Sequence, residues 1–194
     1  MTQTRRMGVE GSTQRTVLMD AAEAILCDEG YIGISARNVA NRAGFTKQLL
    51  YYYFRTMDDL ILALVRRIND RRLERFENAL LAVEPLRALW ALNSDPSGAA
   101  LATELTAIAS HRDAVRAEIV TSARQFRALQ VRAVSELLSK RGEKAGHSAA
   151  GIVMIAAALA KTVVSEAALG LTEGHAEALM IVEGMLAQLS VLDG

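Results

Sequence analysis

The sequence predicts an all-helical protein, and three observations support this prediction. Alanine, leucine, glutamate and arginine dominate the chain, and the apolar residues recur at helical spacing. No alternating run of apolar and polar residues is bounded by the turn residues of a hairpin. The clearest loop signals, Pro85 and the SDPSG segment at 94–98, fall between helical stretches. We therefore expect about nine helices and no sheet.

Length and composition describe a folded protein without global basicity. The 194 residues are 51% hydrophobic and 23% charged, which is typical of a globular chain with a substantial core. Formal net charge is zero, so any attraction to nucleic acid must come from the local placement of basic residues. Cys27 is the single cysteine, which excludes an intramolecular disulfide and agrees with a reducing cytoplasm.

Neither a signal peptide nor a membrane segment is expected. The N-terminal arm, residues 1–14, is polar and lacks an apolar core. It is either a disordered tail or an arm that contacts DNA through Arg5 and Arg6. The most apolar run, residues 149–160, has 12 residues before Lys161, whereas a membrane span needs about 20.

The first helix is predicted from about residue 12 or 13 to Gly30. Its apolar residues recur at helical spacing and should face one core; they are Val17, Leu18, Ala21, Ala22, Ile25 and Leu26. Ser35 is the expected N-cap of a second helix that ends near Ala43, before Gly44. Thr46 is the expected N-cap of a third helix.

The third helix has one apolar and one polar face. Leu50, Tyr53 and Phe54 form the apolar stripe, so Lys47, Gln48, Tyr51 and Tyr52 must point outward. Lysine pairs with phosphate or guanine, glutamine can bond adenine, and phenols donate to phosphate. Leu49 could contact a thymine methyl group. On spacing alone, residues 35–54 fit a DNA-reading helix-turn-helix or an ordinary helical hairpin.

Six further helices are expected after this motif. A long connecting helix should run from Met57 to about Val83, capped by Thr56, with its arginines paired to interspersed carboxylates. The others are a short helix around Trp90, then helices at about 99–110, 114–140, 148–169 and from the turn at 170–174 to about 192. GEKAGH, at 142–147, should form a turn.

The motif resembles the N-terminal signature of the TetR-type transcriptional regulators. The resemblance covers about residues 15–64 without a gap, and the matching positions are Gly30, Tyr31, Ser35, Val39, Ala40, Ala43, Gly44, Thr46, Lys47, Leu50, Tyr51, Tyr53, Phe54 and Leu60. Gln48, Leu49 and Tyr52 depart from residues common in the family. Met57 replaces a frequent phosphate-binding lysine, for which Arg55 can compensate.

The resemblance implies two domains and two kinds of partner. Residues 1–56 would hold the arm and the DNA-binding domain, and residues 57–194 a helical domain for effector binding and dimerisation. The implied partners are double-stranded operator DNA, a small apolar or amphipathic effector and a second copy of the chain. The expected DNA-binding residues are Ser35, Arg37, Thr46, Lys47, Gln48, Leu49, Tyr51, Tyr52 and Arg55.

The other two predicted sites lie in the second domain. Candidate effector-pocket residues are Trp90, Thr103, Ala107, Phe126, Met154 and Leu159. The expected dimer contacts lie on the last two helices, whose small and apolar residues exceed what one chain could cover; they are Ile152, Ile155, Ala156, Leu159, Val163, Leu179, Val182 and Leu186. Burial of that surface inside its own domain is the alternative.

No enzymatic machinery is evident in the sequence. There is no glycine-rich phosphate loop, zinc-ligand pair or nucleophile elbow, so no cofactor or metal is expected. Glu104 and His111 share a helical face, but a histidine at a helix C-terminus is explained by the helix dipole. We expect a ligand-responsive repressor rather than an enzyme; the alternative is a helical small-molecule carrier or enzyme with a vestigial helix-turn-helix.

Overall fold

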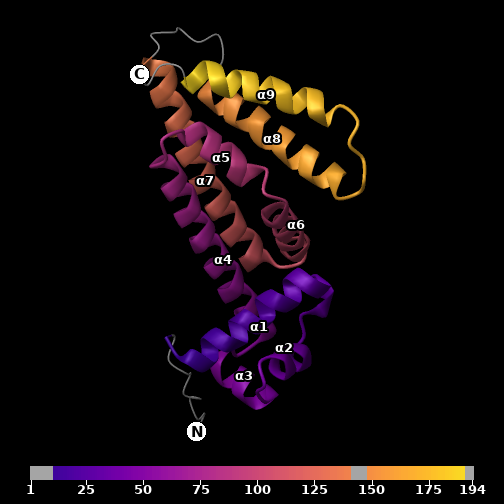
Figure 1. Cartoon of the computed structure of the whole chain (residues 1–194). Coiled ribbons are helices and arrows are strands. Elements are labelled where there is room, and N and C mark those ends of the chain that lie inside the picture. Colours follow the sequence, from indigo (N-terminus) through magenta and orange to yellow (C-terminus); the bar gives the residue numbers. More distant parts are fainter. Residues whose placement is uncertain (1–10, 141–147, 191–194) are drawn as a thin grey trace. The chain divides into compact units, whose positions relative to one another are not determined.

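The computed structural model describes residues 11–140 and 148–190 of the chain. Within these ranges the protein is all helical, with nine α-helices, one 3-10 turn and no strand (Figure 1). This result confirms the predicted fold class. Arg5, Arg6, the expected 142–147 turn and the predicted helix end near residue 192 lie outside the described residues.

The backbone divides into two compact units. Unit 1 comprises the described residues of Met1–Asp70 together with Leu101–Val120, and unit 2 comprises those of Arg71–Ala100 and Thr121–Gly194. The helix-turn-helix segment lies wholly in unit 1. Unit 1 also takes in the first part of the long connecting helix and a segment far along the chain, which the sequence did not indicate.

Unit 1 begins with the elements α1 (Thr13–Glu29), η1 (Tyr31–Gly33), α2 (Ala36–Arg42) and α3 (Lys47–Tyr53). Gly30 ends α1 with a φ of 70°, a left-handed conformation that glycine adopts without steric cost. The 3-10 turn η1 was not predicted. It fills the connection between α1 and α2 with three residues that carry no periodic signal of their own.

The helix α4 (Met57–Leu80) follows, and a reciprocal cap fixes its start. Thr56 Oγ1 accepts a hydrogen bond from Asp59 N at 3.1 Å, and Asp59 Oδ2 accepts one from Thr56 N at 3.1 Å. Both bonds satisfy amides that the first helical turn leaves unpaired. The predicted cap is therefore correct, whereas the helix ends three residues before the predicted Val83.

The core of unit 1 joins α1, α2, α3 and α4 to the helices α6 (Pro96–Ala109) and α7 (Asp113–Lys140). Leu18, Leu60 and Ile108 each have a relative exposure of 0% within this one cluster. The predicted inward residues of the first helix are buried, except Val17.

The helix α6 begins at Pro96, inside the SDPSG segment that was expected to be a loop. Asp95 Oδ1 accepts a hydrogen bond from Ser97 N in its first turn. Pro96 fits there because a first-turn amide needs no helical partner.

Arg66 and Arg67 of α4 are paired, but with carboxylates outside α4 itself. In unit 1, Arg67 donates to Asp20 at 2.6 Å and to Glu23 at 2.7 Å, and Arg66 donates to Glu118 at 2.9 Å. The prediction of a salt-bridged face is correct for these residues, but the expected partners on the same helix were wrong. Sequence spacing reveals neighbours along one helix only, whereas these contacts depend on how the helices pack.

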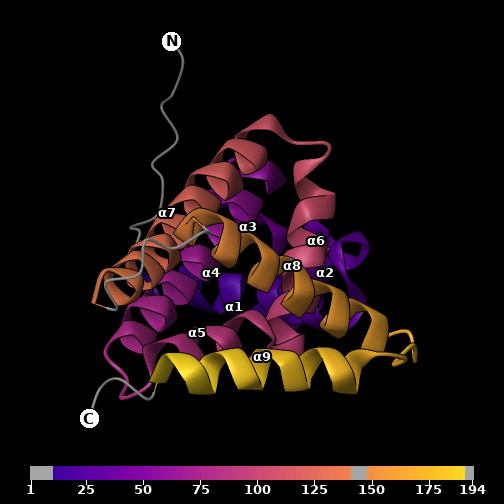
Figure 2. The same cartoon turned by 90° about the horizontal axis from the view of Figure 1, so that it is seen from above.

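Unit 2 contains the rest of α4 and α7 with α5 (Pro85–Asn93), α8 (Ala149–Ala167) and α9 (His175–Ser190). Its buried cluster is small and centres on Phe76, Ala79 and Leu89. The helices α8 and α9 meet at the turn that joins them, and Figure 2 shows them diverging away from it (compare Figure 1). His175 Nε2 lies 2.9 Å from Glu166 Oε2 across the turn that joins them.

By length and composition alone, one helix in the described ranges is apolar enough to cross a membrane. This helix is α8, with a mean hydropathy of 1.6 over its most apolar window, of which 11% is buried. The apolar run at 149–160, from which no membrane span was expected, has 12 residues, but the helix is longer because it continues past Lys161. One such helix is weak evidence of a membrane span, since helices that pack in soluble proteins pass the same test.

Candidate nucleic-acid interface

The helix α3 separates its buried and exposed faces as the sequence predicts. Thr46 Oγ1 accepts a hydrogen bond from Leu49 N at 3.2 Å and so caps the helix. Leu50 and Tyr53 are buried, with relative exposures of 0% and 7%. Lys47, Gln48, Tyr51 and Tyr52 are exposed on the opposite side. Two apolar anchors therefore hold the helix while four polar side chains remain available for contact.

The turn between α2 and α3 is set by Gly44. This residue has a φ of 70°, and a Cβ built there would meet no atom within 4 Å, so conformation rather than space selects glycine. Phe45 N donates to Ala40 O at 2.9 Å and closes the end of α2. The predicted helix end at about Ala43 is correct, because Ala43 is the C-cap.

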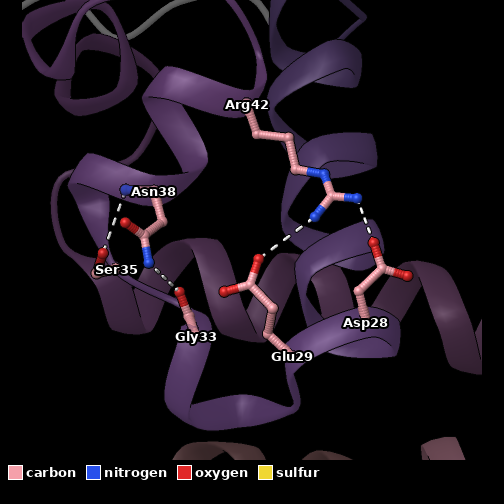
Figure 3. A network of polar contacts seen from close by, with 6 residues as sticks. All are labelled: Asp28, Glu29, Gly33, Ser35, Asn38 and Arg42. Carbon is pink, nitrogen blue, oxygen red and sulfur yellow. Dashed lines mark hydrogen bonds and ion pairs between the residues drawn. The ribbon is translucent and has the colours of Figure 1, made fainter.

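A polar network fixes the start of α2 and ties its end to α1. Ser35 Oγ accepts a hydrogen bond from Asn38 N at 3.2 Å, as predicted, and Asn38 Nδ2 donates to Gly33 O at 2.9 Å. Arg42 pairs with Asp28 and Glu29, which stand on the last turn of α1 (Figure 3). The charge of Arg42 is thus offset within the protein.

Tyr53 anchors α3 through its hydroxyl as well as its ring. The hydroxyl lies 2.7 Å from Ser12 Oγ and donates to Gln14 Oε1 at 2.9 Å. Ser12 therefore does not cap α1 with its side chain. Helical spacing identifies Tyr53 only as an apolar residue and does not predict this contact. The signal was a tyrosine at a buried position, since a buried phenol needs a hydrogen-bond partner.

Three other cations of the helix-turn-helix and its flank differ from Arg42. Within the described ranges, Arg37, Lys47 and Arg55 are exposed and have no hydrogen bond or ion pair. Arg42 and Arg67, by contrast, face carboxylates. The formal net charge of the chain is zero, but α3 and its flanks therefore carry positive charge that no carboxylate of the described residues offsets.

The outer side of α3 is hollowed rather than flat. A surface hollow of about 410 Å³ is lined by Thr46, Gln48, Leu49 and Tyr52. Leu49 is half-buried and packs against the core of unit 1, so its side chain is only partly available to a ligand. Met57, at the position where the resemblance implies a lysine, also packs against that core. Arg55 stays exposed beside it.

The predicted effector-pocket residues do not gather in one unit. Thr103 and Ala107 belong to unit 1 and are exposed on α6. The other four belong to unit 2, where Phe126 is buried, Trp90 and Leu159 are half-buried, and Met154 is 51% exposed. Within the described ranges, no group of three histidine, cysteine, aspartate or glutamate residues could hold a metal ion.

The predicted dimer residues lie on α8 and α9, but most are half-buried. Ile155 is 72% exposed. The half-buried residues are Ile152, Ala156, Leu159, Val163, Leu179, Val182 and Leu186. Larger exposed apolar side chains outside the predicted dimer set are Met154, which was predicted to line the effector pocket, and Met180, Ile181 and Met185, with relative exposures between 51% and 66%. Small rotations of a helix decide which neighbours of a periodic stripe face outward, and spacing does not fix those rotations.

Comparisons with known proteins agree with this geometry. Residues 18–64 match the family model of the bacterial regulatory proteins of the tetR family. No curated protein shows significant sequence similarity to the chain. Many solved structures share its fold. They include a putative TetR-family regulator from Rhodococcus sp., with 17% identity, a TM-score of 0.72, and coverage of 92% of this chain and 100% of that one.

Two further structures are similar over most of their length. The reduced form of NemR from E. coli has 20% identity and a TM-score of 0.75, and the match covers 89% of this chain and 97% of that one. A putative regulator from Saccharomonospora viridis in complex with choline has 15% identity and a TM-score of 0.72, with coverage of 90% and 92%. At these identities the likeness concerns the fold.

The fold and the outward face of α3 define an all-helical protein with an N-terminal helix-turn-helix. Its N-terminal segment matches the family model of the bacterial regulatory proteins of the tetR family, and the resemblance inferred from the sequence is confirmed. Members of this family are DNA-binding transcriptional regulators and not enzymes. The comparisons therefore support a DNA-binding regulator.

Proposed function

We propose that this protein is a cytoplasmic, homodimeric repressor that a small-molecule effector releases from operator DNA. The observation that carries the proposal is the face of α3 opposite Leu50 and Tyr53. This face combines a lysine, an amide and two phenols, and none of the four is buried in the core.

Each exposed group of α3 suits a distinct contact with B-form DNA. Lys47 can pair with a phosphate or with guanine, and Gln48 can bond adenine through both atoms of its amide. Tyr51 and Tyr52 can donate to phosphate oxygens. Arg37 and Arg55, which have no internal partner, would add attraction that depends on salt. The short helix would enter the major groove by its exposed side.

The exposed apolar surface of unit 2 supports the homodimer. Ile155 of α8 and Ile181 of α9 are 72% and 60% exposed, and methionines of both helices are exposed beside them. Apolar surface left in water is unfavourable, and a two-fold pairing of these helices in two subunits would remove it. A two-fold dimer would place its reading helices about 34 to 36 Å apart, one turn of DNA.

Contacts inside unit 1 support a route by which effector binding could affect the reading helix. Glu104 of α6 accepts a hydrogen bond from Tyr31 N in η1 at 2.8 Å. Arg112, just before α7, donates to Asp58 at 2.7 Å and lies 5.4 Å from the Tyr31 ring centroid. The segment between α6 and α7 is thereby fastened to the elements that carry α2. A movement of α6 would change the position of these elements.

Effector control requires the effector to prefer the released state. Each tenfold loss of operator affinity needs about 1.4 kcal/mol of differential binding between the two states. The regulator from Saccharomonospora viridis, which is in complex with choline, shows that a protein of this fold can hold a small molecule.

The test is binding to DNA taken from upstream of the gene for this chain. Lys47→Ala and Tyr51→Phe should each weaken binding about tenfold in an anisotropy titration, because each removes a donor worth about 1 to 3 kcal/mol at a polar interface. Arg132→Ala is the matched control, since it removes an exposed cation from α7 in unit 2.

The titration also defines the outcome that contradicts the proposal. Unchanged affinity in both α3 variants, with thermal melting as in the wild type, would remove α3 from the interface. Saturable ligand binding or turnover without any effect on DNA would favour the carrier or enzyme instead. A reporter gene measured with and without the protein decides between repression and activation.

A further inference from the structure

Arg72 lacks the carboxylate partner that Arg67 and Arg75 of the same helix have. Arg72 is half-buried on α4, with its guanidinium carbon 5.6 Å from the centroid of the Phe76 ring and 5.0 Å from that of Phe126. The two rings stack on each other, with centroids 5.5 Å apart and planes at 27°. The cation therefore lies against a pair of aromatic rings.

No acidic group of the described chain compensates Arg72. It has no hydrogen bond or ion pair within the described ranges, whereas Arg67 pairs with Asp20 and Glu23. Arg75, one turn further along α4, pairs with Asp95 at 3.3 Å. Burial, together with the positive charge of Arg75, lowers the pKa of Arg72 below its usual value. A half-buried cation without an anion is unfavourable, and its guanidinium carries five donors that need acceptors.

The surroundings of Arg72 combine apolar area with a few polar groups. Phe126 lies on the same face of α7 as Ser122 and Gln130, four residues to either side. Ser122 is buried, and Gln130 Oε1 accepts a hydrogen bond from Asn93 Nδ2 of α5 at 2.8 Å. Aromatic rings with a small number of oriented polar groups are the usual lining of a small-molecule site.

We propose that Arg72 is the charged anchor for the effector and that the effector is an organic acid with an apolar or aromatic body. The guanidinium would donate two parallel hydrogen bonds to the carboxylate, while its planar face stays against the buried rings of Phe76 and Phe126. The proposal rests on the proposed function, because it assigns the effector of that regulator to a chemical class.

Arginine is suited to this role in a way that other residues are not. Its planar group can stack on an aromatic ring and still present its edge to a carboxylate, which a lysine ammonium cannot do. A cationic effector such as choline would be repelled by Arg72. The structure therefore distinguishes the expected ligand of this chain from that of the regulator in complex with choline.

The experiment compares three probes that differ only in the head group. These are 4-phenylbutyrate, the neutral 4-phenylbutanamide and the cationic 4-phenylbutylamine, titrated calorimetrically into the full-length protein without DNA. We expect the carboxylate to bind about tenfold more tightly than the amide, because a charge-assisted bidentate pair is about twice as strong as a neutral one. The amine should not bind.

Two substitutions at Arg72 and one control locate the effect. Arg72→Gln should lower carboxylate affinity to that of the amide without changing amide affinity, and Arg72→Lys should give an intermediate value. Arg71→Gln removes the same charge from the adjacent, exposed position and should leave the carboxylate preference intact. Thermal melting checks the fold, and Arg72→Lys retains the test if Arg72→Gln does not fold.

Two results would overturn the assignment. One is a wild-type protein that binds the carboxylate no better than the amide, including binding of neither. The other is a carboxylate preference that persists without Arg72, which would leave this arginine a purely structural partner of the two rings. Either result leaves operator binding untouched, since that is measured without any acid. Failure of the proposed function would instead appear as a lack of DNA binding.

Discussion

The two units of the molecule differ in how completely they bury their apolar residues. In unit 1, one cluster includes Leu18, Leu50, Leu64 and Ile108, each at 0% or 1% exposure, and it joins six helices. In unit 2, the corresponding cluster centres on Phe76, Ala79 and Leu89. The helices α8 and α9 of unit 2 also leave large apolar side chains in water, among them Ile155 at 72% exposure.

This difference indicates what each unit requires from outside itself. Unit 1 buries most of its apolar groups, with Ile32 and Val120 as exposed exceptions, and it offers the polar groups of Lys47, Gln48, Tyr51 and Tyr52 to a charged partner. Unit 2 keeps apolar surface on α8 and α9 and an unpaired cation at Arg72. A partner that binds only the folded state stabilises that state. We therefore expect the stability of unit 2 to depend more strongly on a second subunit and a ligand than the stability of unit 1 does.

The largest expected effect is on unit 2, through the apolar face of α8. Ile155→Glu would place a charge in each half of a two-fold interface. Burying a charge at an apolar contact costs about 2 kcal/mol or more, and the two-fold symmetry makes the dimer incur this cost twice. We therefore expect the dissociation constant of the dimer to rise at least about 100-fold. Size-exclusion chromatography with light scattering measures this change. Val83→Glu is the control, as Val83 is also exposed but lies between α4 and α5.

If the Ile155→Glu variant is a monomer or a weak dimer and still binds operator with wild-type affinity, the exposed face of α8 and α9 has no part in DNA binding. That result would contradict the inference that unit 2 requires a second subunit for function. A fully retained dimer would place the interface elsewhere.

The next effect tests the core of unit 1. Leu64→Ala removes a side chain that is 1% exposed, and we expect it to lower the free energy of unfolding by about 2 to 5 kcal/mol, since the substitution leaves a cavity. Urea denaturation followed by circular dichroism measures the change. Leu81→Ala, at a position 85% exposed, should change it by less than about 0.5 kcal/mol. Equal losses at both positions would refute the described packing.

The smallest effect concerns the network between α1 and α2. Arg42→Ala breaks the ion pairs with Asp28 and Glu29, all of which are at least partly exposed, so we expect a loss of about 0 to 1 kcal/mol. Operator affinity should change less than it does in Lys47→Ala, because the charge of Arg42 is already offset. An effect as large as that of Lys47→Ala would show that Arg42 contacts DNA directly.

Local features of the reading motif could be predicted from the sequence with few errors. Ser35 and Thr46 cap their helices, Gly44 adopts the left-handed conformation, and Leu50 and Tyr53 face inward. These features depend on the chemistry of single residues and on the helical period, and both can be read within a few positions of the chain.

Features that depend on contacts across the fold could not be predicted in the same way. The partners of Arg67 lie 44 and 47 residues away, and Glu104 accepts its hydrogen bond from an amide 73 residues earlier. The isolation of Arg72 is of the same kind, since acidic residues surround it in the sequence but none pairs with it in space. Composition indicated a balanced charge, but packing decided which charges remain unpaired.

The sequence by itself determined the helical class, the caps and turn of the reading motif, and the side of α3 that faces water. It could do so because helix formation and capping are governed by neighbours within about one turn. Only the tertiary structure decided which arginines are neutralised, how Tyr53 is held and which apolar residues of α8 and α9 stay exposed. Those outcomes depend on long-range packing, where a side chain meets residues that the order of the chain does not place beside it.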